Sequence, residues 1–247
     1  MATSRDNVET KTTMTDLVTE TDRASERLIV ETLLRARPHD GVLGEEGANT
    51  QGSSGVRWVI DPIDGTTDFF YGYPGFNVSI AAEVDGTVIA GAVADVYLGE
   101  LYSAGLGAGA SVEGRAIRCN TSTPLNTALV ATGFGYHPTR RKHQARVVYD
   151  IIDRIRDIRR GGAAATDLCS VARGRVDAYF EMGLAPWDFA AGALIVAEAG
   201  GRVGTLDGSP LGPRFVMAAG VDLFGPLADL LRSVDADCDP LGGTPAP

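Results

Sequence analysis

The chain has 247 residues, of which 44% are hydrophobic, so it can bury a large core in one domain or in two closely packed smaller ones. Its net charge of −10 opposes non-specific adhesion to nucleic acid and to anionic membranes. Three scattered cysteines, a polar start and the absence of a long apolar run predict a soluble cytoplasmic protein without a nucleic-acid or membrane partner.

The first part of the sequence predicts one helix followed by strands. After an extended lead-in, Thr21 or Asp22 is expected to cap a helix over residues 23–36. The apolar side of this helix is expected to comprise Ala24, Leu28, Thr32 and Leu33. A Gly/Ser-rich loop then leads into a pattern typical of an antiparallel meander, in which Asp85-Gly86 suits a type I′ turn. The expected strands are 56–60, 76–84, 87–96 and 100–104, with a further short strand before 113.

Beyond Cys119, strands and helices alternate, which is typical of an α/β unit. The tail after Val234 is rich in Asp, Gly and Pro and is expected to be disordered. We expect residues 1–120 to form an α+β subdomain and residues 121–247 an α/β subdomain, packed as one compact unit. The expected elements of the second part are strands at 128–132 and 175–181 and helices at 142–156, 163–173 and 186–199.

The segment Trp58–Phe69 (WVIDPIDGTTDF) carries the most chemistry. A hydrophobic strand delivers two carboxylates, Asp61 and Asp64, onto a tight turn. Mg²⁺ prefers oxygen ligands in octahedral geometry, so this pair with the carbonyl of Ile63 forms a partial ligand shell. If Thr66 begins a helix, the free amides there favour a phosphate beside the cation. An isolated D-x-x-D-G motif is, however, as often only a turn as a metal site.

Two further acidic positions change this balance. Glu45 and Glu46 follow an expected strand, and Asp188 stands at the start of an expected helix. Each alone is more often a solvated acidic loop or a helix N-cap. Together with Trp58–Thr67, their order and spacing resemble those of the inositol monophosphatase family, within the lithium-sensitive, Mg²⁺-dependent phosphatase superfamily. The segments that carry this resemblance are Gly44–Glu46, Trp58–Thr67, Trp187–Gly192 and Glu198–Gly201.

The resemblance covers nearly the whole chain and implies the α/β class with a layered αβαβα sandwich. It also implies two or three Mg²⁺ ions. In two-metal sites of this kind, the ions stabilise the attacking and leaving oxygens during transfer of a phosphoryl group. The first ion would be held by Glu45, Asp61 and the carbonyl of Ile63, and the second by Asp61, Asp64 and Asp188. A third, weaker ion would lie near Glu45 through water.

The same resemblance implies roles in catalysis and substrate binding. The first metal and Glu45 would activate a water, whose proton would pass toward Thr66 and Asp22. Lys11 and Asp16 resemble the mobile active-site loop of the family, although a polar lead-in to the helix explains them as well. The residues implied to contact substrate are Asp64, Gly65, Thr66, Gly162, Ala164, Glu181 and Asp188.

Two departures from the family pattern are visible. The family usually has an extra helix before the mobile loop, whereas ten residues precede Lys11 here, so either that helix is absent or the start is misassigned. Asp68 stands where many members have Asn, which adds one negative charge near the cluster.

The resemblance implies a homodimeric phosphomonoesterase that hydrolyses inositol 1-phosphate or a related cyclitol or sugar-alcohol phosphate. Alternatives within the superfamily are fructose 1,6-bisphosphate, histidinol phosphate or 3′-phosphoadenosine nucleotides as substrate. An alternative of another class is a regulatory binding protein that keeps the fold. A haloacid-dehalogenase mechanism is disfavoured because its D-x-D-x-T nucleophile needs a closer spacing than that of Asp61 and Asp64.

Three weaker signals are assigned to structure. The glycines in 105–110 imitate a dinucleotide fingerprint, but no helix follows them, so a turn of the meander is expected. The arginine-rich stretch 140–160 could attract phosphate or RNA, yet its helical spacing favours a solvated helix face. His39, His137 and His143 lack metal-ligand spacing and are expected at the surface.

Overall fold

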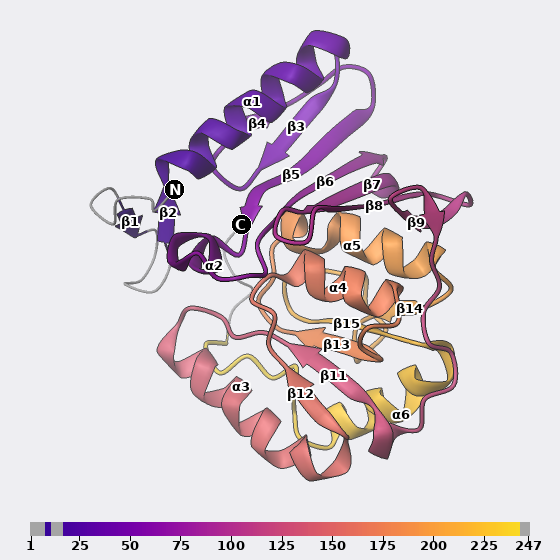
Figure 1. Cartoon of the computed structure of the whole chain (residues 1–247). Coiled ribbons are helices and arrows are strands. Elements are labelled where there is room, and N and C mark those ends of the chain that lie inside the picture. Colours follow the sequence, from indigo (N-terminus) through magenta and orange to yellow (C-terminus); the bar gives the residue numbers. More distant parts are fainter. Residues whose placement is uncertain (1–7, 11–16, 243–247) are drawn as a thin grey trace.

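The computed structural model describes residues 8–10 and 17–242, which form alternating layers of helices and sheets (Figure 1). Helix α1 (Glu20–Ala36) lies on an eight-stranded sheet, and α4 (Ala164–Ala172) and α5 (Pro186–Glu198) separate this sheet from a five-stranded one. Helices α3 (Pro138–Ile151) and α6 (Val221–Arg232) cover the outer face of the smaller sheet. The predicted αβαβα sandwich is confirmed.

The larger sheet has the strand order β10-β9-β8-β7-β6-β5-β3-β4. All its neighbours pair antiparallel except β3 and β5, which run parallel. Asp85 and Gly86 both have positive φ, 50° and 76°, as the predicted type I′ turn requires. The strands are β3 (Gly41–Gly44), β4 (Asn49–Thr50), β5 (Val56–Asp64), β6 (Asn77–Val84), β7 (Thr87–Asp95), β8 (Glu100–Gly105), β9 (Gly109–Val112) and β10 (Arg115–Ala116).

The smaller sheet is mixed, with the order β12-β11-β13-β15-β14. Strand β11 pairs parallel with both β12 and β13, and the β13, β15 and β14 pairs are antiparallel. The strands are β11 (Leu129–Thr132), β12 (Asp157–Arg159), β13 (Ala178–Glu181), β14 (Arg202–Gly204) and β15 (Val216–Ala219). The short elements are β1 (Val8–Thr10), β2 (Leu17–Thr19), α2 (Thr66–Tyr71), η1 (Leu125–Thr127) and η2 (Ile152–Arg154).

The layer between the sheets explains why α5 is apolar on nearly every side. A helix covered on all faces has no polar stripe, and α5 is buried from Phe189 to Val196. Helices α4 and α5 approach closely because residue 192 is glycine: a Cβ there would lie 2.8 Å from Leu168. The two subdomains thus share one interior, and the division at residue 120 stays a prediction.

Several expectations about element boundaries are wrong. Helix α1 begins at Glu20, so Asp22 lies inside its first turn and is fully buried rather than capping it. The expected apolar side of α1 faces outward, with Leu28 66% exposed. The tail expected to be disordered is held by an ion pair of 2.7 Å between Arg140 and Asp239, and its last residues, 243–247, lie outside the described residues.

The turn predicted within 105–110 is confirmed, because the antiparallel strands β8 and β9 are joined there and the amide of Ala108 donates to the carbonyl of Gly105 at 2.8 Å. The amides of Gly107 and Gly109 also donate to the carboxylate of Glu198 at 2.8 Å. The helix expected at 142–156 starts earlier, with His137 as N-cap and Pro138 in its first turn. No helix of the described residues is long and apolar enough to cross a bilayer.

Candidate active site

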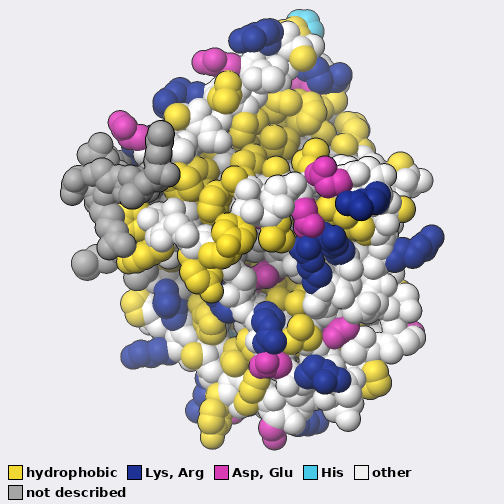
Figure 2. Space-filling view, viewed as in Figure 1, with side chains coloured by type: hydrophobic (Ala, Val, Ile, Leu, Met, Phe, Trp, Pro, Cys, Tyr) yellow, Lys and Arg dark blue, Asp and Glu magenta, His cyan; other side chains and the backbone are white. Residues whose placement is uncertain are grey.

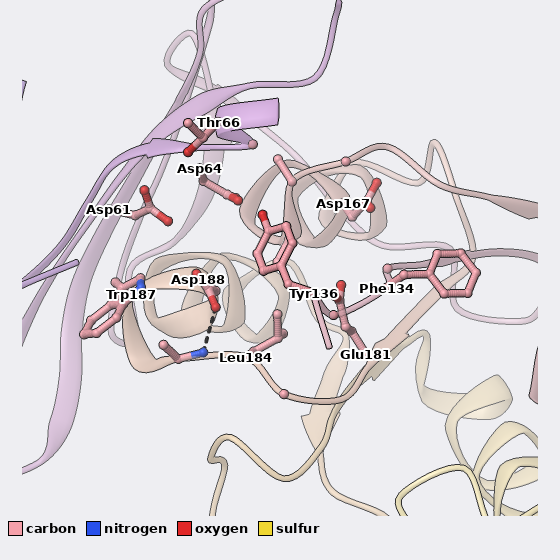
Figure 3. Close-up of a pocket in the computed structure, with 18 of the residues that line it drawn as sticks. Asp61, Asp64, Thr66, Phe134, Tyr136, Asp167, Glu181, Leu184, Trp187 and Asp188 are labelled. Carbon is pink, nitrogen blue, oxygen red and sulfur yellow. Dashed lines mark hydrogen bonds between the residues drawn. The ribbon is translucent and has the colours of Figure 1, made fainter. Parts of the chain in front are cut away.

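A pocket of about 480 Å³ opens where the larger sheet meets α4 and α5 (Figure 3). Its volume is in the range of small-molecule sites. The predicted metal and substrate residues all line it: Glu45, Asp61, Ile63, Asp64, Gly65, Thr66, Gly162, Ala164, Glu181 and Asp188. Lys11 and Asp16 lie outside the described residues.

Strand β5 carries the first acid to the pocket wall. Asp61 is 1% exposed, and its Oδ1 accepts a hydrogen bond from the amide of Ile63 at 3.1 Å. The register of β5 against β6 shifts between Asp61 and Asp64, which ends regular pairing where the acids turn inward. Gly65 then adopts φ 86°, and α2 begins at Thr66 as predicted.

The hydroxyl of Thr66 lies between two acceptors. Its oxygen is 3.2 Å from Oδ1 of Asp22 and 3.1 Å from the carbonyl oxygen of Ile63. Asp22 does not line the pocket, but this contact places it directly behind Thr66, as the predicted pairing of the two residues requires.

Asp64 is fixed by two donors from other segments. Its Oδ2 accepts from the side-chain amide of Asn77 at 3.0 Å and from the backbone amide of Ala165, in the first turn of α4, at 2.8 Å. Burial raises the pKa of Asp64 to about 6 although both hydrogen bonds lower it, and the charge of Glu45 adds to the rise.

Asp188 caps the first turn of α5 and also lines the pocket. It is the third residue of α5, and its Oδ2 accepts from the amide of Ala185 at 2.6 Å, the dashed line in Figure 3. Burial, followed by the charges of Asp64 and Glu45, raises the pKa of Asp188 well above its usual value. The N-cap of α5 is Ala185, so the N-cap interpretation of Asp188 is wrong: Asp188 caps the helix from its third residue and also lines the pocket.

The acids interact as one electrostatic group. Burial raises the pKa of Asp61 strongly, and Glu45, Asp64 and Asp188 each raise it further. As the side chains stand, no three His, Cys, Asp or Glu residues within 8–10 and 17–242 are arranged to hold an ion. The donor set nevertheless fits Mg²⁺, because hard carboxylate oxygens facing one pocket are its preferred ligands. Binding would require these side chains to turn toward a shared centre, and the ligand assignment stays a prediction.

The opposite end of the pocket holds a second group of titratable residues. Glu181 accepts a hydrogen bond from the hydroxyl of Tyr179 at 2.6 Å. Burial raises the pKa of Glu181 to about 7, although this bond and the charge of Arg160 lower it. Asp167 is 8% exposed, and burial followed by the charge of Glu181 raises its pKa. A Cβ at residue 133 would meet Glu181, so Gly133 leaves the space that this side chain fills.

Part of this lining was not predicted from the sequence. Arg140 and Arg160 were assigned to a solvated helix face, but both line the pocket, and the side chain of Arg140 is only 11% exposed. Arg160 could have been found from its place two residues before Gly162. The other lining residues without a predicted role include Phe134, Tyr136, His137, Asp167, Leu184 and Trp187.

Known proteins are similar to this chain in sequence and in fold. The profile of the inositol monophosphatase family matches residues 2–229. The inositol-1-monophosphatase of Mycobacterium bovis is 49% identical over 205 residues, which cover 79% of this chain and 71% of the relative. The Nus factor SuhB of Escherichia coli is 39% identical over 232 residues, which cover 88% of this chain and 86% of the relative.

Solved structures agree. The IMPase of Thermotoga maritima matches with a TM-score of 0.85 at 33% identity, covering 94% of this chain and 89% of that one. SuhB of Mycobacterium tuberculosis matches with a TM-score of 0.78 at 44% identity, covering 87% of this chain and 84% of that one. The chain therefore belongs to the inositol monophosphatase family and is a phosphatase of that family.

Proposed function

We propose that this phosphatase is Mg²⁺-dependent and hydrolyses inositol 1-phosphate or a related cyclitol or sugar-alcohol phosphate. The observation that carries the proposal is that Glu45, Asp61, Asp64 and Asp188, from separate segments, all line one pocket. Buried carboxylates that raise one another's pKa are suited to a cation.

The carboxylates and the carbonyl of Ile63 would hold the ions, as the family resemblance implies. Bound magnesium offsets the charge of the carboxylates and of the phosphoryl oxygens, and lowers the pKa of water. Thr66 can receive a proton from an attacking water while its own proton passes to Asp22, because the two side chains are already within 3.2 Å.

The other end of the pocket supports a polyol as the leaving group. Glu181 offers carboxylate oxygens to hydroxyl groups there, with Asp167 and Arg160 adding to the polar lining, and Asp188 can contact a hydroxyl from the side of the metal ligands. Gly162 and Ala164 leave room at the wall because they have small side chains or none. A substrate with one phosphate and several hydroxyl groups fits this pocket, with the phosphate near the metal ligands and the hydroxyl groups near Glu181.

The decisive assay is phosphate release from a panel of esters by the purified chain, with Mg²⁺ and with EDTA. The panel contains inositol 1-phosphate, a sugar-alcohol phosphate, fructose 1,6-bisphosphate, histidinol phosphate and a 3′-phosphoadenosine nucleotide. We expect the highest kcat/KM with inositol 1-phosphate, inhibition by Li⁺ and loss of turnover in Asp61→Asn. Folded protein that shows no turnover across this panel would refute the proposal.

A homodimer is part of the proposal. Hydrophobic side chains gather over the upper part of the face shown in Figure 2, where α1 and the larger sheet lie. The β7–β8 connection also exposes Val96, Tyr97 and Leu98, which are 50–59% accessible. Contiguous exposed apolar surface often marks an interface. Size-exclusion chromatography with light scattering measures the oligomeric state, and a monomer would refute this part.

A regulatory binding role is the second candidate. It is favoured by the similarity to Nus factor SuhB of Escherichia coli, and it is compatible with catalysis. A variant without turnover, such as Asp61→Asn, would separate the two, because a binding role should survive the loss of the carboxylate.

A further inference from the structure

Helix α1 turns three polar side chains toward the loops of the active site. Asp22, Ser25 and Glu26 lie at i, i+3 and i+4, which places them on one face of the helix. Asp22 contacts Thr66, and the hydroxyl of Ser25 donates to the carbonyl of Pro62 at 3.1 Å. The proposed function uses Asp22 but gives Glu26 no role.

Glu26 uses both carboxylate oxygens on one loop. Its Oε2 accepts from the amide of Glu46 at 2.9 Å, and its Oε1 accepts from the amide of Ala48 at 3.0 Å. The side chain is 6% exposed, so these contacts are shielded from water. Hydrogen bonds to a charged acceptor are stronger than those between neutral groups. The loop between β3 and β4 is therefore fastened to α1 at two points.

The residue inside this fastened loop is Glu45, which lines the pocket. On its other side, the amide of Glu45 donates to the carbonyl of Ile60 in β5 at 3.1 Å. The loop also closes on itself, because the amide of Gly44 donates to the carbonyl of Ala48 at 2.6 Å. Glu45 is thus held between β5 and the carboxylate of Glu26.

Gly44 keeps the space that this contact needs. A Cβ at residue 44 would lie 2.1 Å from Oε2 and 2.8 Å from Cδ of Glu26, and 3.2 Å from the Cβ of Ala48. These separations are shorter than van der Waals contact, so any side chain at residue 44 would displace the carboxylate. Gly44 and Glu26 therefore form one packing unit beneath Glu45.

We propose that Glu26 is a positioning residue: by holding the 44–48 loop, it keeps Glu45 in the pocket and sets the affinity of the site for a divalent cation. The inference rests on the proposed function, because the position of Glu45 affects cation binding only if the pocket takes a cation. Glu26 itself does not line the pocket.

The test compares two variants that disturb the same contact in different ways. Glu26→Gln replaces one acceptor by a donor that faces an amide donor, and it removes a charge. Gly44→Ala displaces the carboxylate sterically and changes no charge. Each protein is titrated with Mn²⁺ alone, followed by electron paramagnetic resonance, and its unfolding by urea is measured in EDTA. For both variants we expect the Kd for Mn²⁺ to rise about tenfold, the equivalent of one charge-assisted hydrogen bond.

Glu198→Gln is the matched control. Glu198 also clamps two loop amides, those of Gly107 and Gly109 at 2.8 Å, but it does not line the pocket. It should lose stability to urea without a change in the Kd for Mn²⁺. The double variant Glu26→Ala/Gly44→Ala should bind Mn²⁺ no more weakly than Glu26→Ala alone, because the carboxylate that the added methyl group meets is gone.

The outcomes distinguish a failure of the positioning role of Glu26 from a failure of the proposed function. If the wild-type chain binds Mn²⁺ and Glu26→Gln binds it as tightly as Glu198→Gln does, the positioning role is wrong while the proposed function stands. If Glu26→Gln weakens binding but Gly44→Ala does not, the effect is one of charge, and the positioning role is again overturned. A wild-type chain that binds no Mn²⁺ overturns the proposed function and this inference with it.

Discussion

Replacing Asp61 by Asn should stabilise the metal-free protein and at the same time remove its response to magnesium. Asp61 is 1% exposed, and its pKa is raised by burial and then by Glu45, Asp64 and Asp188. Asn has nearly the same shape and keeps the oxygen that accepts from the amide of Ile63. The substitution therefore removes the repulsive charge and little else.

The expected magnitudes follow from this environment. Removing a buried charge that one amide hydrogen bond compensates only in part is worth about 1–3 kcal/mol. For a chain of this size each kcal/mol moves Tm by about 2–4 °C, so Asp61→Asn should raise the Tm of metal-free protein by about 2–12 °C. In wild type, Mg²⁺ at about 100 times its Kd adds about 2.7 kcal/mol. This corresponds to a rise in Tm of about 5–11 °C, which the variant should largely lose.

The assay is differential scanning calorimetry in EDTA and in excess Mg²⁺, repeated at rising pH because the pKa of Asp61 is raised and the repulsion grows as its carboxyl ionises. The matched control is Asp40→Asn. Asp40 is 3% exposed, but its hydrogen bonds with Arg37 and Ser54 lower its pKa. Asp40→Asn should therefore be destabilising under both conditions. An Asp61→Asn variant that is less stable than wild type in EDTA, or that gains as much from Mg²⁺, would refute the reasoning.

Three further predictions concern other parts of the pocket and core. Glu181 has its pKa raised to about 7 in the folded state from the usual 4.5, so metal-free stability should fall as pH rises from 4.5 to 7. Glu181→Gln should remove up to about 3 kcal/mol of that fall, measured by urea unfolding at several pH values; an unchanged pH profile would contradict it. Gly162→Ala should cost about 1–3 kcal/mol and raise KM, because φ is 111° and a Cβ would lie 1.8 Å from Asp68; wild-type KM and urea midpoint would count against it. Leu168→Ala should cost about 2–5 kcal/mol in urea with kcat/KM retained, and a smaller loss would show that the interior between the sheets collapses around the cavity.

Elements with strong local signals could be predicted from the sequence. The apolar run before Asp61 gave a strand at the right place, and Pro186 began a helix where expected. The turn at Asp85-Gly86 was found because only a few residue types accept positive φ at both positions. These signals lie within a few residues of the feature that they determine, so no knowledge of the tertiary structure is needed.

Elements that depend on distant partners could not be predicted. Strand β12 (Asp157–Arg159) has only three residues, too few for a clear alternation signal, and it forms because its backbone pairs with β11. The tail is ordered through Asp239, whose partner Arg140 lies 99 residues earlier. The same contact turns Arg140 away from solvent. One long-range pair that local patterns do not reveal therefore explains two wrong predictions, the disordered tail and the solvated position of Arg140.

Helix α1 shows most clearly why part of the site could not be predicted from the residue pattern. Carboxylates are almost never buried without partners, so the sequence favoured an apolar face through Leu28. The structure instead buries Asp22 and Glu26, whose partners lie 44 residues away for Asp22 and 20 and 22 residues away for Glu26. The inward face of α1 is thus selected by loops of the active site as well as by core packing. The buried acids of α1 contact backbone amides and a threonine hydroxyl beside the pocket, so we expect substitutions on this helix face to alter the pocket although no residue of α1 lines it.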